Sequence, residues 1–118
     1  MSKIVIIGAG AMGSAFALPC LDNNHDINIV GTHLENDFID EFKKNDNLHP
    51  GLKTKIPKAI NIFKFEKFDE LLQSNVDLIV LGISSKGIEW VSDQICRLYK
   101  DKKAPKLLML TKIGRAHV

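Results

Sequence analysis

A glycine-rich segment close to the amino terminus constrains the fold of this chain more than any other feature. An apolar run of β-branched residues, Ile4–Ile7, leads directly into the sequence Gly-Ala-Gly-Ala-Met-Gly at residues 8–13. Small and apolar residues follow as far as Leu18. This order predicts a strand, a tight turn and a helix, which is the context in which a G-x-G-x-x-G pattern indicates dinucleotide binding. The alternative is a structural strand–helix turn that binds nothing.

The three glycines have separate physical roles in the dinucleotide interpretation. Gly8 permits the sharp turn at the end of the strand, and Gly10, which has no Cβ, lets the main chain approach a diphosphate. Gly13 allows the new helix to pack closely on the strand, and that helix directs unpaired N–H groups and the positive end of its dipole at the phosphates. The segment therefore supplies these predicted cofactor-binding residues: Gly8, Ala9, Gly10, Ala11, Met12 and Gly13.

Composition and charge narrow the class of protein. The 118 residues are 45% hydrophobic and 25% charged, which is ordinary for one globular domain. The chain has no apolar stretch long enough to span a bilayer and no signal-peptide pattern, and its net charge of +2 is too small to argue for nucleic acid. Cys20 and Cys96 lack any metal-binding motif, and the histidines are scattered. We therefore expect a cytoplasmic protein with no metal site and no nucleic-acid or membrane partner.

Apolar runs and helical patterns alternate along the whole chain. This alternation predicts an α/β fold with a Rossmann-type doubly wound parallel sheet of about five strands in the order 3-2-1-4-5. Pro19 falls inside the first expected helix and predicts a kink or a restart there, and Asn36 is the expected N-cap of the second helix. The segment 45–52 is expected to be loop. The expected strands are 3–7, 27–30, 59–63, 76–81 and 106–110, and the expected helices are 11–23, 36–44, 65–74 and 86–99.

Polar residues follow two of the expected strands and are candidates for further cofactor contacts. Thr32 and His33 stand where an acidic residue often holds the adenosine ribose, so they bind the ribose or a 2′-phosphate, or they are simply loop residues. Glu35 comes slightly later than that position. Ser84 and Ser85 end the fourth strand, where they can donate to a phosphate or a nicotinamide and can equally cap the next helix. The choice between NAD and NADP stays open.

With these residues placed, the chain resembles the amino-terminal domain of NAD(P)-dependent glycerol-3-phosphate dehydrogenases over nearly all of residues 3–112. The resemblance implies a dinucleotide cofactor, NAD or NADP, and hydride transfer between dihydroxyacetone phosphate and sn-glycerol 3-phosphate, in glycerophospholipid metabolism. It also implies a homodimer in the full-length protein. The motifs that carry it are the glycine-rich segment, Val30–Leu34, His49–Gly51, Lys55–Pro57, Leu81–Gly87 and Leu110–Lys112.

The resemblance also assigns one catalytic candidate and a domain organisation. Lys112 matches a lysine in the family's active site, where its ammonium would orient and polarise the substrate oxygen. The second half of the family is a helical domain with the other catalytic lysine and most substrate contacts. We therefore expect residues 1–112 to form a dinucleotide-binding domain, truncated before that helical domain and inactive alone. Residues 113–118 back-translate to a sequence that looks like a sequencing-library adapter, and we expect a non-native tail.

Two other functions are compatible with the same sequence features. The first is a stand-alone NAD(H)-sensing regulatory module that controls a partner, which would be complete at this length. The second is the amino-terminal domain of a related dehydrogenase that acts on a hydroxy acid or reduces an imine. The gene downstream of the Lys112 codon distinguishes the first of these from a dehydrogenase fragment.

Overall fold

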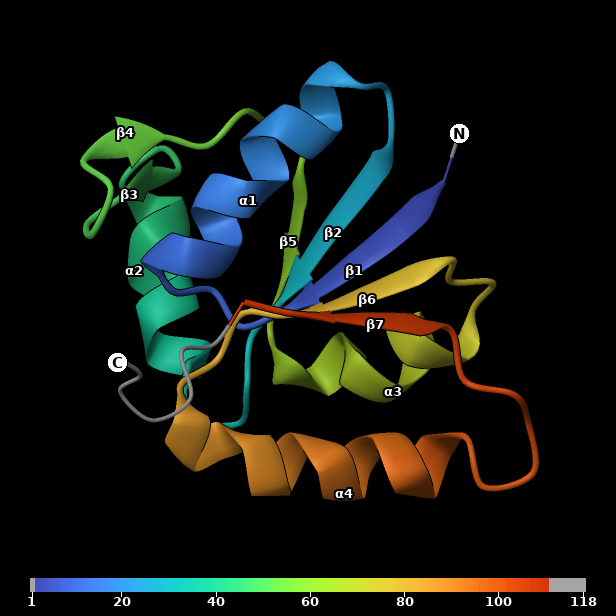
Figure 1. Cartoon of the computed structure of the whole chain (residues 1–118). Coiled ribbons are helices and arrows are strands. Elements are labelled where there is room, and N and C mark those ends of the chain that lie inside the picture. Colours follow the sequence, from blue (N-terminus) through green and yellow to red (C-terminus); the bar gives the residue numbers. More distant parts are fainter. Residues whose placement is uncertain (1, 111–118) are drawn as a thin grey trace, which may run out of the picture.

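A five-stranded parallel sheet forms the centre of the computed structural model, which describes residues 2–110 (Figure 1). Lys112 and residues 113–118 lie outside the described residues, so the predictions made for them are carried forward as predictions. The strands follow the order β5-β2-β1-β6-β7, which confirms the predicted order 3-2-1-4-5. Their bounds are β1 (Lys3–Ile7), β2 (Asp26–Val30), β5 (Asn61–Phe63), β6 (Leu78–Leu81) and β7 (Lys106–Met109).

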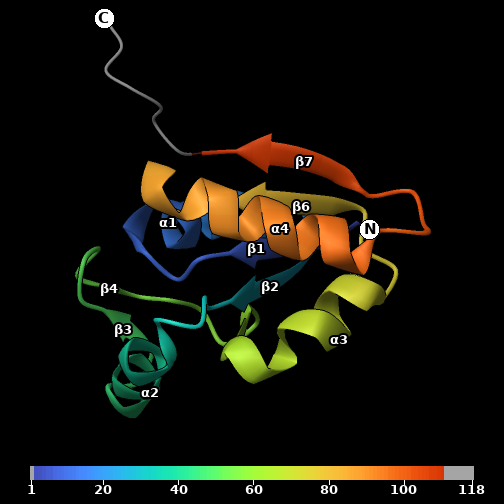
Figure 2. The ribbon, with the colours of Figure 1, turned by 90° about the horizontal axis from the view of Figure 1, so that it is seen from below.

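Helices cover both faces of this sheet. Figure 1 shows α1 (Ala11–Asp22) and α2 (Asn36–Lys44) on one face and α3 (Phe68–Gln73) and α4 (Ile88–Leu98) on the other, and the turned view in Figure 2 agrees. The short 3-10 helices η1 (Phe65–Lys67) and η2 (Ser85–Gly87) precede α3 and α4. A separate antiparallel hairpin, β3 (Leu48–His49) with β4 (Thr54–Lys55), follows α2.

The apolar run in β1 is continuous because both faces of the strand are covered. Ile4 and Ile6 belong to the buried cluster beneath α1 and α2, and Val5 and Ile7 belong to the cluster beneath α3 and α4. Consecutive side chains of a strand point to opposite faces, so a doubly covered strand needs apolar residues at every position. The central position of β1, between β2 and β6, follows from the same requirement.

Two local expectations from the sequence are wrong. Segment 45–52 was expected to be loop, but Leu48–His49 pairs with Thr54–Lys55 in an antiparallel hairpin, and Lys53 in the connection between these strands has left-handed backbone. Of the two outcomes expected at Pro19, α1 does not restart, since the helix runs through this residue without interruption, and the kink stays a prediction. The N-cap of α2 is Glu35 and not Asn36, whose side chain instead reaches across to accept a hydrogen bond from the Phe65 N–H at 3.1 Å.

Three glycines bring the ends of β1 and β6 against the start of α1. Gly8 has a φ of +111°, which L side chains rarely adopt, and a Cβ there would collide with the Gly82 carbonyl. A Cβ on Gly13 would lie 2.8 Å from the Gly8 carbonyl oxygen, and one on Gly82 would lie 2.9 Å from the Gly13 Cα. These approaches involve main-chain atoms on both sides, so no side-chain rotation can relieve them. The strand–turn–helix geometry therefore depends on the absence of a Cβ at all three positions.

Among the helices of residues 2–110, none has the length and apolar character needed to cross a membrane.

The glycine contact predicts that Gly82→Ala destabilises the fold. The new Cβ must displace the α1 main chain, which we expect to lower the free energy of unfolding by about 1–3 kcal/mol, the usual cost of overpacking. Urea denaturation followed by circular dichroism measures this. Gly10→Ser is the matched control, because a Cβ at Gly10 meets no atom within 4 Å and serine is a favourable N-cap. Equal stability of Gly82→Ala and the unmodified chain would contradict the close approach.

Candidate functional site

A cleft of about 670 Å³ opens at the carboxyl edge of the parallel sheet. Three segments line it. They are Gly10 after β1, Thr32–Glu35 after β2, and, after β6, Gly82, Ile83, Ser84, Lys86 and Gly87 together with Trp90 of α4. Ligands of open α/β sheets bind outside the carboxyl ends of the strands, where the strand order reverses. In this sheet the order reverses between β1 and β6, and the cleft lies at the ends of those two strands.

The start of α1 presents unpaired main-chain donors at this cleft. Gly10 is the N-cap of the twelve-residue helix α1, it makes no side-chain cap, and the first turn carries no acidic residue. The first N–H groups of a helix have no partner within the helix, and the helix dipole adds positive potential there. Since a Cβ at Gly10 would meet only open space, the main chain at this position is accessible to a ligand. The arrangement suits an anion.

Glu35 ties the loop after β2 to the glycine-rich turn, and the sequence interpretation had set it aside. Its Oε1 accepts hydrogen bonds from the Thr32 N–H at 2.9 Å and from the Ala9 N–H at 3.2 Å. The Glu35 main chain also caps α2, and the residue lines the cleft. Counting residues from the glycine motif placed Glu35 too late, because such a count cannot show that the chain turns back after Thr32. The cleft therefore contains one carboxylate at the end of β2.

Aromatic rings form the wall of the cleft below the β2 loop. The centroid of the His33 ring lies 4.8 Å from that of Trp90 and 5.9 Å from that of Phe65. Trp90 also contacts Phe68, the buried first residue of α3, so the wall rests on the core. Trp90 is partly buried against the core, and its ring also lines the cleft. Its spacing of four residues from Lys86 on a helical segment was the signal that could have placed both residues at the same cleft.

The structure brings together only some of the residues predicted to contact a cofactor. Gly10, Thr32, His33 and Ser84 line the cleft, whereas Gly8 and Gly13 pack behind it against Gly82. The remaining predicted positions are distributed as follows: Ala9 is fully buried, Ala11 and Met12 are exposed at the start of α1, and Ser85 begins η2.

The predicted capping role of the serines is wrong for α4. The N-cap of that helix is Gly87, whose N–H donates to the Ser84 carbonyl at 2.9 Å, so the 3-10 turn that Ser85 begins lies between Ser84 and α4. The extra turn has no distinct signature in the sequence, because a 3-10 helix and the first turn of an α-helix have similar residue preferences.

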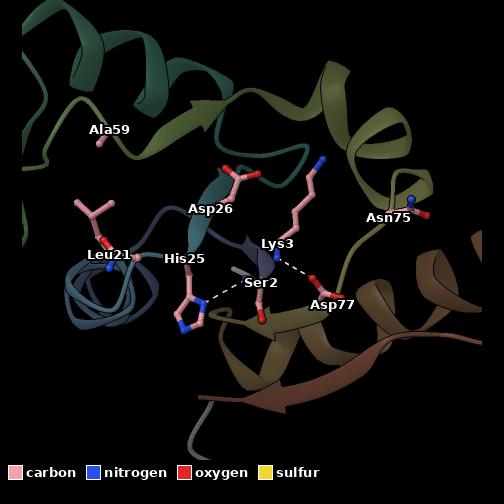
Figure 3. Close-up of a pocket in the computed structure, with 9 residues that line it drawn as sticks. Ser2, Lys3, Leu21, His25, Asp26, Ala59, Asn75 and Asp77 are labelled. Atoms are coloured by element: carbon pink, nitrogen blue, oxygen red, sulfur yellow. Dashed lines mark hydrogen bonds between the residues drawn. The ribbon is translucent and has the colours of Figure 1, made fainter.

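A second hollow, of about 700 Å³, lies at the opposite edge of the sheet, at the amino ends of the strands (Figure 3). Two hydrogen bonds join groups drawn there: the Lys3 N–H donates to Asp77 Oδ2 at 2.8 Å, and the Ser2 N–H donates to His25 Nδ1 at 3.4 Å. None of the helices within residues 2–110 contributes its first turn to the lining of this hollow. The two hollows have similar volumes, so volume does not indicate which one binds a ligand. The position at the carboxyl ends of the strands and the main-chain donors at the start of α1 both favour the cleft at the carboxyl edge.

Comparison with known proteins agrees with this geometry. The model of the family described as "NAD-dependent glycerol-3-phosphate dehydrogenase N-terminus" matches residues 3–113. The NADP(+)-dependent glycerol-3-phosphate dehydrogenase of Archaeoglobus fulgidus is 32% identical over 99 residues, which are 84% of this chain and 29% of that protein. The glycerol-3-phosphate dehydrogenase [NAD(P)+] of Shouchella clausii is 35% identical over 89 residues, 75% of this chain and 25% of that protein.

Solved structures share the fold at low sequence identity. The crystal structure of glycerol-3-phosphate dehydrogenase from Coxiella burnetii has a TM-score of 0.70 and 22% identity, and the match covers 94% of this chain and 32% of that one. The 1-pyrroline-5-carboxylate reductase of Streptococcus pyogenes has a TM-score of 0.59 and 24% identity, over 93% of this chain and 34% of that one.

The chain spans between a quarter and a third of the lengths of these relatives. The family match covers all five strands of the sheet and every residue that lines the cleft. The chain therefore belongs to the family of amino-terminal domains of NAD-dependent glycerol-3-phosphate dehydrogenases.

Proposed function

We propose that the cleft binds NAD or NADP and that the chain is the cofactor-binding domain of a glycerol-3-phosphate dehydrogenase. The observation that carries the proposal is at Gly10, where the unpaired start of α1 meets open space, since a Cβ added there would have no atom within 4 Å. A diphosphate needs both features, because its oxygens must come within hydrogen-bond distance of main-chain N–H groups. Lys86, exposed at the rim of the cleft, adds a positive charge.

The adenosine half of the cofactor has a complementary surface beside the β2 loop. His33 and Trp90, whose rings are tilted by 40° to each other, offer aromatic surface for a purine, and Thr32 and Glu35 offer polar groups for the ribose. The Glu35 carboxylate accepts from ribose hydroxyls readily but repels a 2′-phosphate, so it favours NAD over NADP. The proposal includes both cofactors, because the relative from A. fulgidus is named as an NADP(+)-dependent enzyme and the one from S. clausii as an NAD(P)+ enzyme.

The nicotinamide half is assigned to the opposite end of the cleft, near the end of β6. Ser84 is exposed there and supplies a hydroxyl, and Ser85 follows it in η2. The bound cofactor would supply the hydride acceptor or donor for dihydroxyacetone phosphate and sn-glycerol 3-phosphate. The role of Lys112 in orienting the substrate oxygen is part of this proposal, supported by its position two residues beyond Leu110, whose N–H continues the sheet by donating to the Leu81 carbonyl at 3.0 Å.

The proposal extends to the whole enzyme. Residues 1–112 would act with a helical domain that supplies the remaining substrate contacts, in a cytoplasmic homodimer that serves glycerophospholipid metabolism. Support comes from the lengths of the relatives, of which this chain covers 29% and 25%. Family membership favours this function over a stand-alone NAD(H) sensor and over a hydroxy-acid or imine-reducing dehydrogenase.

The assignment of Gly10 predicts that Gly10→Ser removes cofactor binding and leaves the fold intact. The serine side chain fills the space required for the diphosphate, and its hydroxyl takes a helix N–H, so we expect the dissociation constants for NADH and NADPH to rise at least about tenfold, or about 1.4 kcal/mol. Isothermal titration calorimetry measures the constants, and circular dichroism verifies the fold. Unchanged binding by this variant would refute the proposed position of the diphosphate.

The position of Glu35 predicts that Glu35→Gln shifts the preference toward NADP. The amide oxygen can still accept from the Ala9 and Thr32 N–H groups, but the charge that repels a 2′-phosphate is gone. The repulsion between one partly screened carboxylate and a 2′-phosphate is about 1 kcal/mol. Its loss should lower the dissociation constant for NADP, relative to that for NAD, about fivefold. Asp37→Asn is the matched control, because it removes the same charge from an exposed position of α2 outside the cleft. An equal shift in both variants would exclude a local effect of Glu35.

The domain organisation predicts that the 118-residue chain binds its cofactor but does not turn over substrate. The helical domain that the resemblance implies supplies most contacts to the substrate, so dihydroxyacetone phosphate should not consume NADH or NADPH in the presence of the purified chain. Absorbance at the reduced nicotinamide band follows the reaction. Measurable turnover would show that residues 1–118 contain a complete active site.

A further inference from the structure

His49 is buried beneath the glycine-rich turn, although it belongs to the separate hairpin β3–β4. Only 1% of its surface is exposed. Its Nε2 lies 2.8 Å from the Ala9 carbonyl oxygen, and its Nδ1 lies 3.0 Å from the Gly51 N and 3.2 Å from the Leu52 N. The ring therefore connects the turn of the hairpin to the turn between β1 and α1.

These partners define the protonation state of the ring. A carbonyl oxygen can only accept, so Nε2 carries a proton and donates it to Ala9, and main-chain N–H groups can only donate, so Nδ1 carries none. The imidazole is therefore neutral, with its proton on Nε2. Phe38 and Phe42 of α2 contact the ring edge-on, at centroid distances of 5.6 and 5.2 Å, and hold its orientation.

The bond to Ala9 determines where the next main-chain donor points. The Ala9 carbonyl accepts from His49 Nε2 and from Ser14 Oγ, the latter at 3.2 Å, so it faces the interior. In a trans peptide the carbonyl and the following N–H point in opposite directions. The Gly10 N–H therefore points away from His49, toward the cleft that Gly10 lines, and no residue within 2–110 accepts a hydrogen bond from it.

We infer that His49 is a positioning residue for the cofactor diphosphate, acting through the Ala9–Gly10 peptide. The inference rests on the proposed function, because the Gly10 N–H needs a diphosphate oxygen as its acceptor. Without His49, the Ala9 carbonyl would accept a single hydrogen bond, from the Ser14 hydroxyl. The imidazole of His49 donates a second and shorter hydrogen bond, and its ring is held in place by Phe38 and Phe42. The hairpin thus contributes to cofactor binding without touching the cofactor.

Two substitutions separate the two hydrogen-bonding atoms of the ring. The amide of His49→Asn ends near the position of Nδ1, so this variant can keep the hairpin contacts but loses the bond to Ala9. The longer amide of His49→Gln reaches the position of Nε2, so it can donate to Ala9 but loses the hairpin contacts. Both variants lose the packing of the ring, so a purely structural role for His49 predicts the same effect from both.

Calorimetric titration of the 118-residue chain with NADH, NADPH and ADP-ribose tests the inference. For the ligand that binds most tightly, we expect His49→Asn to raise the dissociation constant about tenfold, which is the effect of one well-placed hydrogen bond. We expect the dissociation constant of His49→Gln to stay within about threefold of that of the unmodified chain. Equal weakening in both variants, or in neither, overturns the inference while the proposed function stands. If the unmodified chain binds none of the three ligands, the proposed function and the inference both fail.

A second measurement needs no variant. Long-range ¹H–¹⁵N correlation spectra of the unmodified chain identify the protonated nitrogen of each histidine. We expect His49 to be neutral with its proton on Nε2, and the Gly10 amide resonance to shift when ADP-ribose is added. A proton on Nδ1 of His49, or a Gly10 amide that does not respond to bound ligand, overturns the inference even if both variants fail to fold.

Discussion

The close approach of three main-chain segments, at Gly8, Gly13 and Gly82, is the constraint on which the rest of the structure depends. At each of these positions a Cβ would collide with main-chain atoms. Because the Cβ is missing at all three, α1 can lie directly over the ends of β1 and β6. That position puts the start of α1 at the reversal point of the sheet. The unpaired helix N–H groups and the cleft consequently coincide, and an anion finds donors there without any side chain being charged.

Interactions around the Ala9 peptide convert this close packing into a defined binding surface. Glu35 accepts a hydrogen bond from the Ala9 N–H, and His49 and Ser14 donate to the Ala9 carbonyl, so the loop after β2, the hairpin and α1 together hold the two peptide groups that flank the Ala9 Cα. A peptide held on both sides loses little conformational entropy when a ligand binds to its neighbour. The loop after β2 and the hairpin β3–β4 therefore matter to the cleft even where they do not line it.

Much of the fold could be predicted from the sequence, because strong local signals coincide with the global topology. The run Ile4–Ile7, which is apolar on both faces of the strand, and the glycine-rich turn predicted the central strand. The alternation of strands and helices predicted the strand order. The roles of Glu35 and His49 could not be predicted. Each side chain reaches Ala9 only because a short turn brings the chain back toward the glycine-rich segment. The left-handed residues Asp46 and Asn47 form such a turn, and polar residues of this kind are equally common in loops.

Chemical-shift mapping of the ¹⁵N-labelled chain during titration with NADH and NADPH is the most direct test of the central claim, that main-chain donors at the start of α1 receive the diphosphate. The account predicts that the largest amide shifts occur at Gly10 and in the first turn of α1, with further shifts in the loop after β2. Shifts concentrated at Ser2, His25 and Asp77, at the amino edge of the sheet, would contradict it.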